Sequence, residues 1–314
     1  GFSAFWQCNN LAYINIPDNV TSIGATAFSG CEELVSLSLP SGITQIAERT
    51  FEQCRKLQTV TIHSDLTGIG YNAFWGCHSL ISLQIPDSVN SIGPGAFNGC
   101  RSLVSVNIPN GVTIIENRTF IGCNSLSAIV IPQGVTSIGS YAFWECTSLS
   151  NITLPTTVSI IESAAFGLCR GLKEISIPNG VATISDSTFL DCDNLASISI
   201  PNSITSIEDA AFYRCGKLNN ITLSSNLIHI GRGAFSECSQ IDSITIPKNL
   251  VSIGTGIFTG CLSLTSITVE ANNGFFSDID GVLFNADKSS LLIFPNGKTT
   301  DYTIPNNTET IESE

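Results

Sequence analysis

Cysteine is the residue whose number and spacing in this sequence most readily suggest chemistry. The chain of 314 residues contains twelve cysteines, and they follow one another at intervals of 23 residues from Cys8 to Cys261. Zinc sites need close pairs such as Cys-x-x-Cys, and no two of these cysteines are that close. On stacked coils their side chains would point the same way, which holds the Cβ atoms too far apart for a relaxed disulfide. We therefore expect twelve reduced, buried thiols and no metal site.

Other residues with chemical potential give no catalytic arrangement. His63, His78 and His229 occupy three different positions of the 23-residue period, so stacking would not bring them together. The sequence has no P-loop, no dinucleotide fingerprint and no metalloprotease or serine-hydrolase motif. The stretch 278–281 loosely resembles a calcium loop, but its remaining ligand positions are missing, and we interpret it as a turn. The sequence therefore predicts a protein that is not an enzyme and that needs no cofactor.

Asparagine sequons would matter only in a eukaryotic secretory pathway, and in a chain rich in Asn, Ser and Thr they arise easily. They begin at Asn19, Asn117, Asn151, Asn220 and Asn306.

Composition excludes several classes of partner. The net charge is −13, and the 13 basic residues form no run, which disfavours nucleic acids and anionic membranes. Hydrophobic residues make up 43% of the chain, so it can bury a continuous core. No apolar run approaches the roughly 18–20 residues that span a bilayer, so we expect no membrane insertion in this segment. The chain lacks Met and begins and ends within the repeat pattern, which we interpret as a piece of a longer protein.

The cysteines belong to a longer repeated pattern. A Phe lies three residues before each Cys, and a Leu, once Ile, lies three residues after it. The unit is A/T-F-x-x-C-x-x-L-x-x-I-x-I-P-x-x-V-x-x-I-G, and this period with L-x-x-I-x-I is the leucine-rich-repeat signature. One unit cannot bury its own apolar residues, whereas stacked units turn each column into a ladder. The structural columns are represented by Phe74, Cys77, Leu80, Leu83 and Ile85.

The predicted fold class is therefore a repeat solenoid. We expect a right-handed coil with short parallel strands on its concave face, and short strands, turns and short helices elsewhere. Alternating apolar residues point one strand face inward, and the Pro of Ile-Pro ends each strand.

The stretch 85–109, "IPDSVNSIGPGAFNGCRSLVSVNIP", resembles the BspA-like leucine-rich repeats. The resemblance covers residues 2–269, because the Phe-x-x-Cys and Ile-Pro landmarks recur together. It implies a secreted or surface-anchored protein that binds host extracellular-matrix proteins or other cells.

The repeat pattern breaks after Val269, because the next Ile-Pro comes twelve residues late. We assign residues 1–269 to a solenoid of 12 Phe-x-x-Cys repeats, and 270–314 to an irregular, hairpin-containing repeat with the start of a further repeat. Both parts are expected to form one continuous domain. The hairpin strands are expected at about 279–284 and 290–294, around the turn "NADKS", where they would shield the end of the stack.

The outward strand positions form the first candidate binding surface. Of 24 such positions, twenty are Ser, Thr, Asn or Gln, which is either a neutral hydrogen-bonding surface for protein or glycan or simply a soluble strand face. The candidate binding residues on this concave face are Tyr13, Ser82, Gln84, Ser105, Asn107, Ala128, Val130, Asn151, Thr153, Glu174 and Ser176.

Aromatic residues form a second candidate surface on the expected convex face. Trp6, Trp75, Trp144 and Tyr213 follow the column Phe at intervals of 69 residues. They could contact a partner, or each ring could lie over neighbouring turns as partial core. Rings ~14 Å apart form no single patch, which favours the second interpretation.

The leading functional hypothesis is a non-catalytic adhesion module, secreted or on a cell surface. It would bind a host matrix protein, another cell or a glycan through the concave sheet. An intracellular protein–protein scaffold is an alternative, because reduced thiols are usual in the cytosol. A passive stalk without a ligand is a further alternative.

Overall fold

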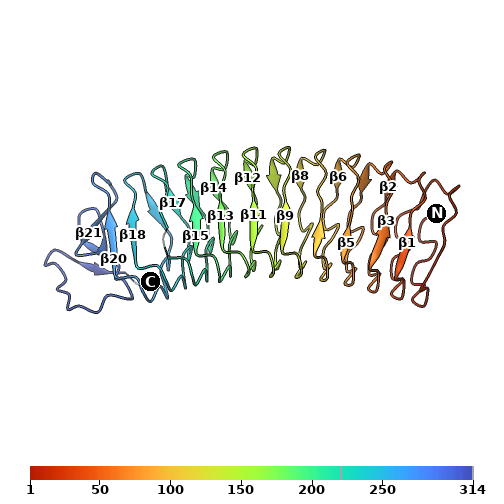
Figure 1. Ribbon diagram of the computed structural model, residues 1–314. Coiled ribbons are helices and arrows are strands. Elements are labelled where there is room, and N and C mark those ends of the chain that lie inside the picture. Colours follow the sequence, from red (N-terminus) through yellow and green to blue (C-terminus); the bar gives the residue numbers. More distant parts are fainter. Residues whose placement is uncertain (220, 313–314) are drawn as a thin grey trace. The chain divides into compact units, whose positions relative to one another are not determined.

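The computed structural model describes residues 1–219 and 221–312 (Figure 1). It contains two compact units, Gly1–Leu172 and Lys173–Glu314, both built from coils of one 23-residue period. Most coils contribute two short parallel strands, which we call the first and second strand rows. The prediction of a repeat solenoid with short parallel strands is confirmed.

In the N-terminal unit, equivalent strands pair in parallel with an offset of one period, for example Ala128 with Asn151. The first strand row comprises β1 (Ser36–Ser38), β3 (Thr59–Thr61), β5 (Ser82–Leu83), β7 (Ser105–Val106), β9 (Ala128–Val130) and β11 (Asn151–Thr153). The second strand row comprises β2 (Gln45–Ile46), β4 (Gly68–Ile69), β6 (Ser91–Ile92), β8 (Ile114–Ile115), β10 (Ser137–Ile138) and β12 (Ile160–Ile161).

The C-terminal unit repeats this plan, and Ser243 pairs with Ser266 in the same register. Its first strand row comprises β13 (Glu174–Ser176), β15 (Ser197–Ser199), β18 (Ser243–Ile246) and β20 (Ser266–Val269). Its second strand row comprises β14 (Thr183–Ile184), β16 (Ser206–Ile207), β17 (His229–Ile230) and β19 (Ser252–Ile253).

The segment that carries the column Phe is a chain of tight turns, which we call the Phe turn. The prediction of short helices here was wrong, since no helix occurs in residues 1–219 or 221–312. Two residues of every Phe turn have positive φ, such as Asn72 (51°) and Gly76 (72°), and a left-handed residue every fourth position interrupts a right-handed helix. Alternate amides, including that of Phe74, donate to carbonyls of the next coil, so they cannot form the hydrogen bonds of a helix.

The core of each unit consists of buried ladders. The column Phe rings stack at 5.1–5.6 Å in the N-terminal unit and 5.2–5.8 Å in the C-terminal unit. The five representative structural residues, Phe74, Cys77, Leu80, Leu83 and Ile85, are all buried. Because one coil lacks a second layer of its own, these ladders stabilise the fold only when coils stack.

The irregular repeat begins with a hairpin that sequence analysis placed only in part. β21 (Phe276–Ile279) pairs antiparallel with β22 (Val282–Asn285), and β22 pairs with β23 (Ser290–Ile293). β24 (Thr310–Ile311) then pairs in parallel with β23. The predicted first strand, about 279–284, therefore spans a turn and most of β22.

The stretch 278–281 was interpreted as a turn, and its second half is one: Asp278 and Ile279 end β21, and Asp280 and Gly281 form the turn to β22. Asp280 and Gly281 have φ of 52° and 80°, as a type I′ hairpin requires. The Asp278 carboxylate accepts a hydrogen bond from the Val269 amide at 2.8 Å, and the Gly281 carbonyl accepts one from Ile267. The hairpin thus packs against β20, and Val282, Phe284 and Leu291 form a buried apolar cluster.

Candidate functional site

The outward residues of the first strand row form a surface that we call the sheet face. Of the eleven predicted binding residues, ten are exposed and Ser82 is partly exposed. Tyr13 and Val130 project most, with 71% and 82% of their surface exposed. Nine of the eleven lie in the N-terminal unit, whereas Glu174 and Ser176 lie on β13 in the C-terminal unit. The structure therefore presents the predicted residues outward, on two separate units.

Asn107 has a structural role that sequence reasoning missed. Its side-chain amide donates to the Ile85 carbonyl at 2.7 Å and accepts from the Ile85 amide at 2.8 Å. The side chain thus replaces the strand ladder where β5 ends, and its polar atoms are already engaged. Asn107 is unsuited to binding a partner through its amide.

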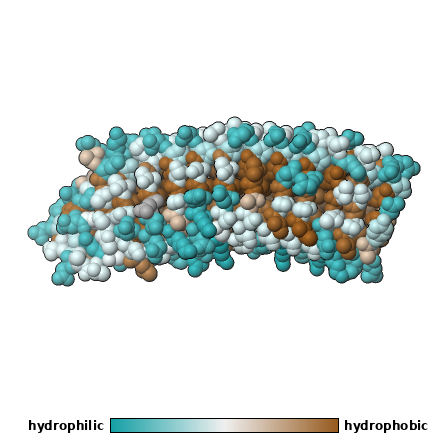
Figure 2. All heavy atoms as spheres, in the orientation of Figure 1, coloured by the Kyte–Doolittle hydropathy of each residue, from teal (hydrophilic) through white to brown (hydrophobic). Residues whose placement is uncertain are grey.

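A column of exposed aliphatic residues borders the sheet face in the N-terminal unit. Val35, Ile81 and Val104 each precede a strand of the first row and are 39–49% exposed. Figure 2 shows apolar atoms among polar ones on the face in view. Sequence analysis missed this column because it considered only the two positions beside the inward residues. The spacing could have revealed it, since the three residues are separated by multiples of 23 residues.

Two hollows lie on the sheet face, one in each unit. The N-terminal hollow has a volume of about 400 Å³ and is lined by Tyr13, Ser36, Ser38, Thr59 and Thr61 among others. The C-terminal hollow, of about 230 Å³, is lined by residues that include Thr222, Ser243, Thr245 and Glu270. Hydroxyl side chains contribute to both linings, together with Asp18 in the N-terminal hollow and Asp242 and Glu270 in the C-terminal one, so these hollows offer hydroxyl and carboxylate groups for hydrogen bonding.

The predicted aromatic column lies on the surface formed by the Phe turns, which we call the turn face. Trp6 is 55% exposed, and Trp75, Trp144 and Tyr213 are partly exposed. In the N-terminal unit, two tyrosines outside that column, Tyr71 and Tyr141, join the tryptophans. Sequence analysis missed them, although each lies three or four residues before a column Trp.

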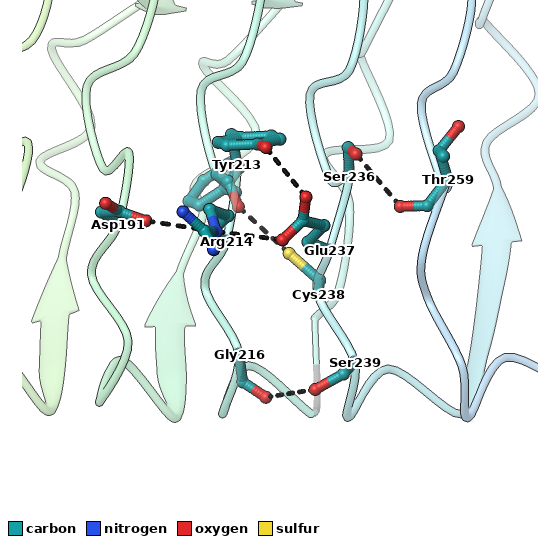
Figure 3. Close-up of polar contacts among 10 residues, drawn as sticks. Asp191, Tyr213, Arg214, Gly216, Ser236, Glu237, Cys238, Ser239 and Thr259 are labelled. Atoms are coloured by element: carbon teal, nitrogen blue, oxygen red, sulfur yellow. Dashed lines mark hydrogen bonds and ion pairs between the residues drawn. The ribbon is translucent and has the colours of Figure 1, made fainter.

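Tyr213, in the C-terminal unit, is occupied by its own neighbours (Figure 3). Its hydroxyl donates to Glu237 at 2.8 Å, which raises the pKa of the phenol above its usual value. Arg214 lies between Asp191 and Glu237, with Nε–oxygen distances of 3.7 and 2.9 Å. Its guanidinium also lies 5.9 Å from the centre of the Tyr213 ring. The polar tip and one ring face of Tyr213 are therefore engaged within the chain.

The 23-residue pattern that builds both faces matches a known family. The family model described as BspA type Leucine rich repeat region (6 copies) matches residues 1–125, 67–193 and 160–289. The chain belongs to this BspA-type leucine-rich-repeat family.

Three crystal structures show how similar its relatives are. A leucine-rich repeat protein from Bacteroides ovatus has 30% identity and a TM-score of 0.75, over 87% of this chain and 76% of that one. A leucine rich cell surface protein from Faecalibacterium prausnitzii has 28% identity and a TM-score of 0.49, over 82% and 87%. The pneumococcal vaccine antigen PcpA has 21% identity and a TM-score of 0.54, over 90% and 75%, which shows the fold alone. No curated protein matched the chain.

The repeat cysteines are satisfied as hydrogen-bond donors. Cys77 Sγ donates to the Phe51 carbonyl at 3.0 Å, and equivalent bonds of 3.0–3.3 Å recur along both units. Burial raises the pKa of Cys31 to about 11, so its thiol is protonated at neutral pH. A protonated, buried thiol is neither a nucleophile nor a metal ligand.

Cys8 departs from the prediction of twelve buried thiols. All cysteines are free, but Cys8 is exposed while the other eleven are buried. It lies in the first coil, where no preceding coil of this structure covers it.

Several other expectations concern metal binding, membrane insertion and glycosylation. Residues 1–219 and 221–312 contain no cluster of three His, Cys, Asp or Glu side chains that could hold a metal. Within the same residues no helix is long and apolar enough to cross a membrane. The sequons at Asn19, Asn117, Asn151 and Asn306 are exposed, and Asn220 lies outside the described residues. Whether any is glycosylated stays a prediction.

Proposed function

We propose that this chain is a non-catalytic recognition module, secreted or on a cell surface, that binds a protein of the host matrix or of another cell. The observation that carries the proposal is the sheet face of the N-terminal unit. It combines exposed short polar side chains with the aliphatic column and with two projecting residues, Tyr13 and Val130. Membership of the BspA-type family and its repeat architecture supports a protein-binding scaffold.

The chemistry of the sheet face suits a protein better than a small ligand. Ser and Thr lose little side-chain entropy when a partner orders them. Ile81 and Val104 lie on adjacent coils, where the Val104 amide donates to the Ile81 carbonyl at 2.9 Å. They therefore give a partner a continuous apolar edge to cover. Tyr is enriched among the residues that contribute most to protein interfaces, which fits Tyr13 beside its hollow.

The intracellular scaffold loses its main support in this structure. That alternative depended on reduced thiols, but ten of the buried thiols donate hydrogen bonds to backbone carbonyls inside the stack. Oxidation follows thiolate character and access, so buried protonated thiols persist in an oxidising compartment as well.

The test uses charge substitutions with a matched control. Ile81→Asp, Val130→Asp and Thr153→Asp each put a carboxylate on the sheet face. Ile160→Asp puts the same group on the second strand row, where Ile160 is 53% exposed. The purified chain is presented to immobilised extracellular-matrix proteins, and retention is measured by biolayer interferometry. We expect the sheet-face variants to bind at least tenfold more weakly than the wild type, and Ile160→Asp to bind equally well.

Two results would contradict the proposal. One is full retention of all three sheet-face variants while circular dichroism shows an intact fold. The other is an equal loss of binding in Ile160→Asp, which would show that binding responds to the net charge of the chain and not to the sheet face.

A further inference from the structure

A groove crosses four coils of the turn face in the N-terminal unit, and we call it the aromatic groove. It has a volume of about 390 Å³, within the range of ligand pockets. It is lined by Tyr71, Asn72, Trp75, Pro94, Gly95, Asn98, Asn117, Arg118, Ser140 and Tyr141.

Aromatic rings stand at the two ends of the aromatic groove. Tyr71 and Trp75 belong to one coil, and Tyr141 belongs to a coil three steps further. Each step is about 5.4–5.5 Å between stacked column Phe rings, so the ends lie roughly 16 Å apart. That length matches an oligosaccharide of a few rings, whereas a single small metabolite would reach only one end.

The ring at the far end is held in place by its neighbours. Tyr141 packs edge-on against Trp144, with ring centres 5.3 Å apart. The Arg118 guanidinium lies 6.0 Å from the centre of the Tyr141 ring. A ring that is fixed before binding loses little entropy when a ligand stacks on it.

Small residues line the middle of the aromatic groove and leave its space unfilled. Gly95 occupies the column that holds Arg118 and Tyr141 in the next two coils, and Asn98 occupies the column of Trp75 and Trp144. The backbone does not demand glycine at this place, because Arg118 and Tyr141 adopt positive φ there as well. A side chain at position 95 would instead press on the Asn72 carboxamide and fill the groove.

Polar groups in the aromatic groove are left without partners. In the described chain the Asn72 and Asn98 carboxamides make no side-chain hydrogen bond, and Arg118 makes no ion pair. Asn117 Oδ1 accepts the Ser140 amide at 2.8 Å, which leaves its Nδ2 donor free. Carboxamides both donate and accept, as sugar hydroxyls do.

From this arrangement we propose that the aromatic groove is a binding site for oligosaccharides. The apolar C–H faces of pyranose rings would stack on the ring faces of Tyr71 and Tyr141 that lie opposite the Arg49 and Arg118 guanidiniums. The sugar hydroxyls would bond to Asn72, Asn98 and Asn117. One arginine is too little positive charge for a nucleic acid. Proline-rich peptides also dock in aromatic grooves, but the unpaired carboxamides along the floor favour a ligand with hydroxyls around its rim.

The experiment screens the whole chain against an array of neutral and uronic-acid oligosaccharides of two to six rings, with proline-rich peptides as a second arm. Affinity for retained sugars is then measured by calorimetry. We expect retained oligosaccharides, and at least a tenfold loss of affinity in Tyr71→Ala and in Tyr141→Ala. Asn98→Trp introduces the residue that the same column carries at Trp75 and Trp144, so it is compatible with the fold, and it should block the groove. Tyr213→Ala is the matched control and should bind like the wild type.

The proposal is supported if the affinity for either a neutral or an acidic sugar depends on these residues. It is overturned if no oligosaccharide is retained, if only proline-rich peptides are retained, or if Asn98→Trp binds sugars as well as Tyr213→Ala does. Because the sheet-face variants leave the aromatic groove intact, this result is independent of the protein-binding test.

Discussion

The turn faces of the two units have the same backbone and different surfaces. The residue two places after the column Phe has positive φ in both units. In the N-terminal unit this column runs Gly76, Gly99 and Gly122 beside the aromatic groove, so it adds no side chain there. The Arg49 and Arg118 guanidiniums lie 5.4 and 6.0 Å from the centres of the Tyr71 and Tyr141 rings, and no carboxylate bonds to either hydroxyl in the described chain. In the C-terminal unit it contains Asp191, Arg214 and Glu237, whose ion pairs engage Tyr213. The repeat therefore fixes where a side chain stands, and the local sequence decides whether the surface is open or already occupied.

Removing a ring from the buried Phe stack should destabilise both units to a similar extent, and this is the largest effect that we expect. Phe97→Ala in the N-terminal unit and Phe212→Ala in the C-terminal unit each remove a ring that is stacked on both sides. We expect each to lower the free energy of unfolding by about 3–5 kcal/mol, the usual cost of a cavity left by Phe. Guanidinium denaturation followed by circular dichroism measures this. A loss below about 1 kcal/mol in one unit would show that the stack is not a shared source of stability.

The position two residues after the column Phe, which we call the glycine column, should contribute less to stability. Its contribution should also differ between the units, because it is Gly99 in one and Arg214 in the other. Gly99 has φ of 74°, and a Cβ there would meet nothing closer than Gly76 Cα and N at 3.7 Å. Gly99→Ala should therefore cost about 1 kcal/mol through backbone strain alone. Arg214→Ala replaces a residue that already bears this strain, and it loses exposed ion pairs, which contribute little to stability, and the contact with the Tyr213 ring.

Both glycine-column variants are compared by the same denaturation measurement at high salt, which screens the Arg214 ion pairs. We expect Arg214→Ala to approach the wild type there, while Gly99→Ala keeps its deficit. If Gly99→Ala also matched the wild type at high salt, positive φ would cost nothing at this position, and the glycines would need another explanation.

Much of this fold could be predicted from the sequence because identical columns stack on themselves. Spacing alone identified the buried ladders of Phe74, Cys77 and Leu80. The Pro of Ile-Pro marked the strand ends only approximately, since it lies one to three residues beyond the end of most first-row strands. The Phe turn was misjudged because Ala and Phe fit a helix locally, whereas the backbone amides bond to the next coil. That choice depends on stacking between coils, which composition does not reveal.

The candidate sites were only partly predictable for a related reason. Comparing each column with itself found Trp75 and Trp144, but Tyr71 and Tyr141 stand in two different columns. They share a groove because neighbouring columns lie side by side on stacked coils. Asn107 looked like a binding residue for the same reason, since its bond to Ile85 joins different positions of two coils.

The smallest expected effect concerns ionisation of Tyr213, which distinguishes an occupied ring from an open one. Its hydroxyl donates to Glu237, and this bond holds the pKa of the phenol above its usual value, with the Glu237 charge acting in the same direction. A raised pKa means that the bond stabilises the fold below the pKa of an unfolded tyrosine and ceases to do so as pH rises through the folded pKa. In Glu237→Gln the acceptor is neutral, so Tyr213 should ionise at lower pH than in the wild type.

Ultraviolet titration of tyrosinate measures this shift, with Tyr213→Phe identifying which of the five tyrosines moves. If Glu237→Gln leaves the whole titration curve where it was, Tyr213 is not held by Glu237 in solution. The C-terminal turn face would then be as open as the aromatic groove. The two turn faces would differ only in the glycines of the column two places after the column Phe.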